Sequence, residues 1–274
     1  MHTPVLGEPT EEKLVQDYVS RWYGRRYSGT GFLYHARIVT RMLEGASFRH
    51  GRKAVTKILD VGCGTGFVSQ LYPNFDIVGI DISDEMLARN PYKWVKAPAE
   101  AIPFPDGTFD FVVVRSLLHH LEKPEVGLKE IHRVLKPGGR FVCWETNFSI
   151  LNDWMRRLAK KTKRFSHLHK NFKRAELLGM IKDAGFAVDQ VYLHGILSYP
   201  LAGFPDILDL KLPIWLGRIL LRMDDLMAKT PIKYLSFSLM VKASKPVPVA
   251  QEAERGDVAP KVVDAISTGH PIEK

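Results

Sequence analysis

Three glycines at alternate positions directly follow an apolar run, in the segment Asp60-Val-Gly-Cys-Gly-Thr-Gly66. Because glycine has no Cβ, such a turn lets backbone N–H groups approach a ligand closely. Asp81 ends the next apolar run, 19 residues after Gly62. At this position a carboxylate can accept hydrogen bonds from both hydroxyl groups of a ribose. The spacing Gly-x-Gly-x-Gly differs from the Gly-x-Gly-x-x-Gly of pyrophosphate-binding loops. It favours a nucleoside-like ligand without phosphates over a nicotinamide dinucleotide.

A second group of polar residues, Arg115-Ser-Leu-Leu-His-His120, follows a later apolar run. Imidazole titrates near neutral pH, so His119 or His120 could accept a proton from an attacking hydroxyl, phenol or acidic carbon. In the alternative interpretation, one of these histidines caps a helix or packs beneath the loop. We expect His120 and His119 to be the catalytic candidates.

Alternating strands and helices must position these residues. The pattern predicts helices over 10–27 and 33–43, followed by strands and helices in the order strand 57–62, helix 66–71, strand 76–81, helix 84–89, strand 93–96, strand 109–115, helix 124–135, strand 140–146, helix 172–184, strand 186–193 and strand 234–243. Gly138-Gly139 is expected to separate the helix that precedes it from the strand that follows it. Such alternation predicts an α/β fold, a doubly wound parallel sheet with helices on both faces.

Several motifs in order give this chain a resemblance to class I S-adenosylmethionine-dependent methyltransferases, in particular the broad group that acts on small molecules and lipids. They cover roughly residues 55–146 and comprise the glycine turn, Asp76–Asp81, Ala97-Pro-Ala-Glu100, 102–112, Ser116–His120 and Arg133-Val-Leu-Lys-Pro-Gly-Gly-Arg140. The resemblance implies a Rossmann-like sheet of seven strands whose last strand is antiparallel. It also implies that the chain is an enzyme of the methyltransferase class, which uses S-adenosylmethionine as the cofactor and transfers its methyl group to an acceptor.

The resemblance places the cofactor along Asp60, Gly62, Cys63, Gly64, Gly66, Asp81, Ile82, Ala99, Glu100 and Arg115. Pro98 departs from the family pattern, because an acidic residue usually stands at its position and binds the adenine amino group. Adenine recognition is therefore assigned to the Ala99 N–H with Glu100 beside it. Tyr27 and Tyr34 are expected to lie over the site, because related enzymes often close it with their N-terminal helices.

We divide the chain into an N-terminal helical lid (1–50), a cofactor-binding core (51–146), a basic and apolar elaboration that holds the last strands (147–244), and a tail expected to be disordered (245–274). With 274 residues and 45% hydrophobic content, the chain can bury a sizeable core. Cys63 and Cys143 are the only cysteines, which favours a reducing, cytoplasmic location over a disulfide framework. No metal site is expected, since the histidines are scattered without a cluster of partners.

The chain carries 39 Lys and Arg against 30 Asp and Glu, and nine basic residues with no acidic one lie between Arg156 and Arg174. Residues 212–227 form an amphipathic pattern, with Trp215, Ile219, Met223, Leu226 and Met227 near one helical face. These features favour a hydrophobic, lipid-like acceptor reached at an anionic membrane surface. The alternatives are an RNA or protein methyltransferase that uses the basic run, a solvated helix face, and a catalytically silent cofactor-binding protein. The attacked atom and the oligomeric state stay open.

Overall fold

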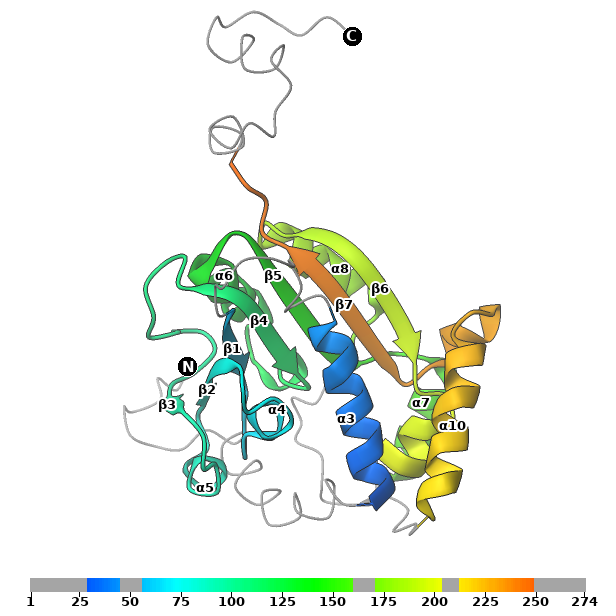
Figure 1. Ribbon diagram of the computed structural model, residues 1–274. Helices are drawn as coiled ribbons and strands as arrows, with labels where there is room; N and C mark the ends of the chain where they lie inside the picture. The colour runs from blue at the N-terminus through cyan, green and yellow to red at the C-terminus, as the bar shows by residue number, and fades with distance from the viewer. Residues whose placement is uncertain (1–28, 45–55, 160–170, 204–211, 249–274) are drawn as a thin grey trace, which may run out of the picture.

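A computed structural model describes residues 29–44, 56–159, 171–203 and 212–248 (Figure 1). Tyr27, the helix expected over residues 10–27, most of the basic run and residues 249–274 of the tail lie outside these ranges. The strands are β1 Lys57–Val61, β2 Asp76–Asp81, β3 Trp94–Lys96, β4 Phe109–Arg115, β5 Leu135–Thr146, β6 Ala187–His194 and β7 Ser238–Ser244.

One sheet contains all seven strands, in the order β3-β2-β1-β4-β5-β7-β6. Every neighbouring pair among the first five strands is parallel, whereas β7 runs antiparallel to both β5 and β6. This confirms the expected seven-stranded α/β sheet with an antiparallel last strand. Strand order reverses between β1 and β4, and ligands of open α/β sheets bind outside the carboxyl ends of the strands at such a point.

Helices cover both faces of the sheet (Figure 1). They are α3 Gly29–Leu43, α4 Phe67–Leu71, α5 Asp84–Leu87, α6 Pro124–Val134, α7 Ile150–Ala159, α8 Arg174–Asp183 and α10 Ile214–Met227. Side chains of β4 alternate between two buried clusters, as the period of a strand requires. Val112 and Val114 pack with residues of α6 and α8, while Phe111 and Val113 pack with residues of α3 and α4.

Three expected boundaries were wrong. β5 begins at Leu135, so Gly138-Gly139 lies within the strand and does not separate it from α6; the pairing with β4 shifts register there, between Phe109 and Phe111. β7 begins only at Ser238, because residues Pro231–Leu235 form a short 3-10 helix, η3, that starts with proline. α3 begins four residues earlier than predicted, at Gly29.

Within the described ranges, no helix has both the length and the apolar character that crossing a bilayer requires.

Candidate active site at the carboxyl edge of the sheet

The glycine turn after β1 satisfies most of its own backbone donors. Gly62 and Cys63 both donate to the Ile80 carbonyl, at 2.8 and 3.0 Å, and Gly66 donates to the Cys63 carbonyl at 2.9 Å. Gly64 donates to the Asp81 carboxylate at 2.8 Å. These four N–H groups are therefore engaged within the protein. With these four donors engaged, the turn is less suited to a phosphate than a helix N-terminus whose N–H groups are free, and its contact with a cofactor stays a prediction.

Glycine is required in this turn for a different reason. Gly62, Gly64 and Gly66 have φ values of +75°, +51° and +82°, a region that other residues rarely adopt. A Cβ on Gly66 would lie 2.4 Å from Asn90 Oδ1, whereas a Cβ on Gly64 would meet only Met86 Sδ, at 3.9 Å. The turn is thus tightly packed at Gly66 and open at Gly64, where a ligand can lie against the backbone.

Asp81 ties this turn to the end of β2. Its two carboxylate oxygens accept hydrogen bonds from Gly64 N and from Ser83 N, at 2.8 and 2.9 Å. The Ser83 side chain in turn caps α5 by accepting from Met86 N. Each carboxylate oxygen retains acceptor capacity beyond one bond, so Asp81 can also accept from the hydroxyls of a ribose. Ile82, next to it, is half-buried.

Asn90 supports the turn from the other side, and sequence analysis missed it. Its amide donates to the Gly64 carbonyl at 3.0 Å and its Oδ1 accepts from Tyr92 N at 3.0 Å. The Cys63 side chain lies beneath the turn, where it fills the space that a Cβ on Gly79 would occupy. Burial raises the pKa of this thiol, so the Cys63 side chain stays protonated and contributes to packing rather than to chemistry. The signal that could have found Asn90 is an asparagine directly after a short helix and before the next strand.

Asp60 lies fully buried at the end of β1. Burial raises the pKa of its carboxyl group to about 7; the Arg115 guanidinium opposes this rise and the neighbouring Asp81 adds to it. A buried carboxyl group that lacks a full counter-charge favours a cationic ligand group beside it. The turn therefore offers carboxylates, which suits an ammonium and hydroxyl groups better than a phosphate. The residues present fit S-adenosylmethionine, which carries both of those groups and no phosphate.

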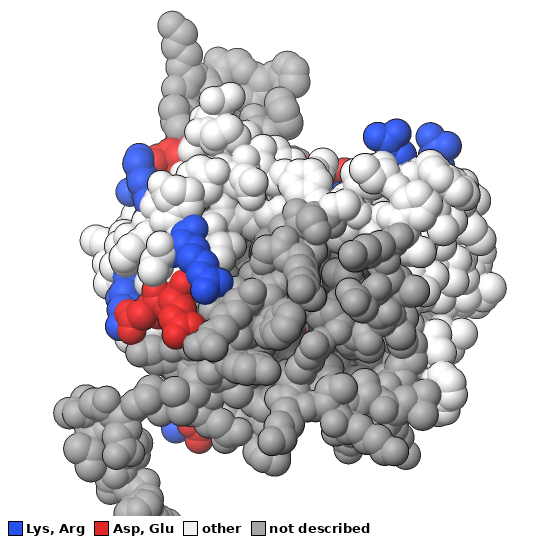
Figure 2. All heavy atoms as spheres, turned by 90° about the horizontal axis from the view of Figure 1, so that it is seen from below, with Lys and Arg blue, Asp and Glu red and all other residues white. Residues whose placement is uncertain are grey.

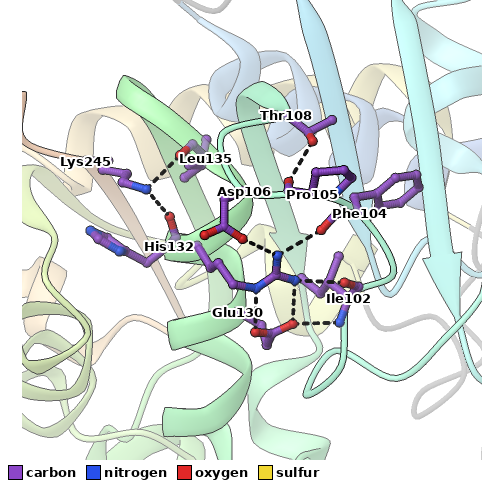
Figure 3. A network of polar contacts seen from close by, with 10 residues as sticks. Ile102, Phe104, Pro105, Asp106, Thr108, Glu130, His132, Leu135 and Lys245 are labelled. Atoms are coloured by element: carbon purple, nitrogen blue, oxygen red, sulfur yellow. Dashed lines mark hydrogen bonds and ion pairs between the residues drawn. The ribbon is translucent and has the colours of Figure 1, made fainter.

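Arg133 fastens the loop at residues 102–106, which directly follows Ala99 and Glu100 in the chain (Figure 3). Its guanidinium, on α6, donates to the carbonyls of Ile102 and Phe104, at 2.8 Å each, and pairs with Glu130 and Asp106 at 2.8 and 2.7 Å. Glu130 also accepts from Ile102 N at 2.9 Å. Hydrogen bonding to Arg133 lowers the pKa of the Glu130 carboxyl.

Ala99 itself is buried and Glu100 half-buried. Ala97 N donates to the Asp81 carbonyl at 3.1 Å, which brings this segment beside the glycine turn. The adenine-binding candidates thus lie next to the ribose-binding candidate, although they follow a different strand.

A buried carboxylate from β5 organises the turn after β4. Glu145 Oε1 accepts from Leu117 N and Leu118 N, at 3.0 and 2.8 Å, and its Oε2 lies 2.5 Å from His119 Nδ1. His119 is 2% exposed and Glu145 is fully buried. Burial raises the pKa of Glu145 to about 7, although the hydrogen bonds from the turn oppose the rise. His119 is therefore held by Glu145, and its geometry is that of a positioning residue.

His120 is half-buried at the end of the same turn, with its ring centroid 4.1 Å from that of His119. Arg115 lies over the Phe67 ring, 5.3 Å from its centroid, and its charge acts on Asp60. Ser116 has φ +54° and donates its N–H to the Trp144 carbonyl. Sequence analysis did not identify Glu145; an acidic residue at the end of the apolar run Phe141-Val-Cys-Trp was the available signal.

Tyr34 does not lie at an open surface. It is fully buried in α3, with its ring against Trp144 and Tyr199, and its hydroxyl lies 3.4 Å from Ser238 Oγ. Burial raises the pKa of Tyr34. Its expected role as a lid residue is not supported by this packing, since the side chain is part of the core.

No group of three or more His, Cys, Asp or Glu side chains with the geometry of a metal site occurs in the parts of the chain that the structure describes.

Residues 59–143 match the methyltransferase domain family. A demethylmenaquinone methyltransferase from Symbiobacterium thermophilum is 41% identical over 106 residues, which cover 33% of this chain and 42% of that protein. The corresponding enzyme from Staphylococcus aureus is 34% identical over 142 residues, which cover 47% of this chain and 57% of that protein. The chain thus spans about half the length of these relatives.

Solved structures share the fold at low sequence identity. A SAM-dependent methyltransferase from Thermotoga maritima has a TM-score of 0.58 and 19% identity, over 85% of this chain and 99% of that one. The [4+2]-cyclase SpnF has a TM-score of 0.54 and 20% identity, over 78% of this chain and 81% of that one. Because one of these neighbours is a cyclase, the fold alone does not specify the reaction. The likeness to methyltransferases rests instead on the sequence match of residues 59–143 to the methyltransferase domain family.

Proposed function

We propose that this protein binds S-adenosylmethionine at the carboxyl edge of β1, β2 and β4 and transfers its methyl group to a small hydrophobic acceptor. One observation carries the proposal: the Asp81 carboxylate accepts from Gly64 N, the Cβ position of Gly64 is open, and the buried Asp60 carboxyl group lies close enough to Asp81 for the two charges to interact. That arrangement favours a ligand with an ammonium and hydroxyl groups. The match of residues 59–143 to the methyltransferase domain family supports the same ligand.

The cofactor supplies a methyl group already activated on a sulfonium, so the protein mainly has to align the acceptor and exclude water. In this proposal Asp60 binds the ammonium, Asp81 the ribose, and Ile82 with the Ala99–Glu100 segment the adenine. His120 is the candidate base at the acceptor side. His119 and Glu145 hold the turn that presents it.

A quinone-like acceptor is the finer part of the proposal. The two relatives are named for demethylmenaquinone, a ring with a long apolar chain, and this chain carries exposed apolar residues on α7, α10 and η3. We place the reaction in the cytoplasm, at a membrane surface, which the two buried free cysteines and the basic composition support.

The test begins with binding of S-adenosylmethionine by calorimetry, for the unmodified chain and for Gly64→Arg. Arginine at Gly64 would fill the open side of the turn, so we expect it to abolish detectable binding. Gly107→Arg is the matched control, because Gly107 has a similar φ of +62° and has only a backbone atom 4.0 Å from its Cβ position, at the opposite end of β4.

Methyl transfer is then measured with methyl-labelled cofactor and a demethylated naphthoquinone that carries a prenyl chain, and in parallel with host extract. We expect Gly64-dependent label in the organic phase. Label in precipitated RNA or protein would overturn the acceptor class. Cofactor binding with no transfer to any fraction would instead identify a catalytically silent binding protein.

A further inference from the structure

Helix α10 is fixed with one side against α3. A Cβ on Gly217 would lie 2.8 Å from Thr30 Cγ2, so the two helices approach closely at that point. Leu220 and Asp224 are buried on the same side. Asp224 accepts hydrogen bonds from Leu197 N and from Ser198 N, at 2.9 Å each, and from the Ser198 hydroxyl. These contacts identify the inward side of α10, and the residues on the opposite side of the helix face away from α3.

That outward side carries two rows of side chains. Trp215, Ile219, Met223 and Leu226 form the first row, at i, i+4, i+8 and i+11, and are 63%, 43%, 43% and 65% exposed. We call them the α10 apolar row. Their spacing matches the sequence expectation, but Met227 does not join them because it lies half-buried on another side. Large apolar side chains that are exposed together on one helix face mark an interaction surface.

The second row is cationic. Arg218 and Arg222 lie on α10 beside the α10 apolar row, Lys229 follows two residues after the end of the helix, and all three are exposed. Among the described residues, none of the three pairs with a carboxylate. The helix has two acidic residues, and both are engaged elsewhere, Asp224 with the Leu197–Ser198 backbone and Asp225 with Arg37 and Arg41. The outward face thus presents apolar and cationic groups and no free anionic one.

Neighbouring elements extend this face. η3 contacts both α10 and α7, and it exposes Ile232 and Tyr234, while α7 exposes Ile150 and Trp154. α10 lies on the right in Figure 1, and Figure 2 shows the same molecule from below with that side still on the right. There the described surface is largely uncharged, with cationic groups at its upper edge. The run of nine basic residues from Arg156 to Arg174 begins within α7 and ends at the first residue of α8.

We infer that the outward face of α10, with η3 and α7 beside it, binds the surface of an anionic phospholipid bilayer. An apolar row that includes tryptophan, flanked by arginine and lysine, is the pattern of a helix that lies in the interface plane of a membrane. Anionic headgroups supply the charges that the cationic row lacks, and the acyl boundary accepts the apolar row. A nucleic acid would match the cations but leave the apolar row in water. A second copy in a two-fold contact would bring the same cationic row to its partner.

Vesicle co-sedimentation of the full chain tests this inference, with vesicles of phosphatidylcholine alone and of phosphatidylcholine mixed with phosphatidylglycerol. We expect binding to the anionic vesicles, weakened when the salt rises from about 0.1 M to about 1 M. Arg218→Gln with Arg222→Gln should lower vesicle affinity roughly fivefold for each cation removed. Trp215→Gln with Leu226→Gln should lower it at least about tenfold.

The control variants lie on α6, where Val126 is 40% exposed and Lys129 is exposed. Val126→Gln and Lys129→Gln should leave vesicle binding unchanged, and circular dichroism checks that every variant folds. Absence of vesicle binding, or binding that the α10 variants do not change, would overturn the inference. So would a dimer in sedimentation velocity that the Trp215→Gln, Leu226→Gln variant abolishes. The assay needs no methyl transfer, so failure of the proposed activity would not alter its result.

Discussion

The glycine turn after β1 and the helix pair α3–α10 both border the carboxyl edge of the sheet, but the contacts that hold them differ in sequence separation. The turn is held by Ile80, Asp81 and Asn90, all within 30 residues of it. α10 is held by Arg37–Asp225 and Arg41–Asp225 pairs that span 188 and 184 residues. A short stretch of chain therefore specifies the proposed cofactor site, whereas the α3–α10 pair, which we expect to border the acceptor, exists only when the whole fold has formed. Substitutions in the glycine turn should therefore change cofactor binding, whereas substitutions that loosen the α3–α10 pair should change methyl transfer and leave cofactor binding unaltered.

The largest effect is expected for Gly66→Ala. Its Cβ would lie 2.4 Å from Asn90 Oδ1 and 2.7 Å from Tyr92 Cδ2, at a φ of +82°. The strain and the clash together should destabilise the protein by about 2 to 4 kcal/mol and remove cofactor binding, as measured by urea unfolding and calorimetry. Gly29→Ala is the control, since Gly29 has φ +54° with no atom near its Cβ position, and it should retain cofactor affinity. Unchanged affinity in Gly66→Ala would contradict the proposed site.

Asp224→Asn addresses the acceptor side. The amide retains one acceptor oxygen but places an NH₂ group where a second oxygen accepts from Ser198, so we expect a loss of about 2 to 3 kcal/mol in unfolding free energy. Cofactor affinity should stay at the unmodified value, while methyl transfer falls. Asp225→Asn is the matched control, because its pairs with Arg37 and Arg41 are partly exposed and should contribute less than about 1 kcal/mol. If cofactor affinity falls together with transfer in Asp224→Asn, the two sides are not separable.

A pH dependence is also expected at Asp60. Burial raises the pKa of this carboxyl from 3.8 to about 7, so the folded protein binds the proton more tightly than the unfolded chain does. Stability is therefore favoured at low pH and declines as the pH rises from about 4 to about 7. Asp60→Asn should reduce that decline, leaving the part that Glu145 contributes over the same range, and make the protein more stable than the unmodified chain at pH 8.

Cofactor affinity should change in the opposite direction. It should rise with pH through about 7 in the unmodified chain as Asp60 ionises, and it should be lower and independent of pH over that range in Asp60→Asn. Thermal unfolding and calorimetry at several pH values measure both effects. An affinity that falls with pH would show that Asp60 does not contact a cationic group.

Sequence patterns predicted the elements whose signals are local. The strand–turn unit around Asp60 and Gly62, the acidic end of β2 and the order of strands and helices all follow from periodicity and glycine positions within short windows. Seven strands and the reversed β7 came from the family resemblance rather than from periodicity. Boundaries were wrong where tertiary contacts decided them, as at Gly138-Gly139, which lies at the register shift between β4 and β5 and hydrogen-bonds to the Lys245 backbone.

The residues that sequence analysis missed have partners that lie elsewhere in the chain. Glu145 holds a turn 26 to 28 residues before it, and Asp224 holds a loop 26 to 27 residues before it. A buried carboxylate of this kind looks like any other acidic residue until the fold brings its donors together. The same reason explains Tyr34, whose packing against Trp144 and Tyr199 was not readable from helical spacing.

The contact between Gly217 and Thr30 has a mechanical consequence. Because no Cβ fits between α10 and α3 there, and because Asp225 bridges to Arg37 and Arg41 one turn apart on α3, the helices cannot slide along each other without breaking both contacts. We therefore expect the two helices to move together as one unit. If the outward face of α10 rests on a bilayer, a displacement of α10 by the membrane is passed on to α3. It therefore also reaches Tyr34 of α3, which packs against Trp144 and Tyr199.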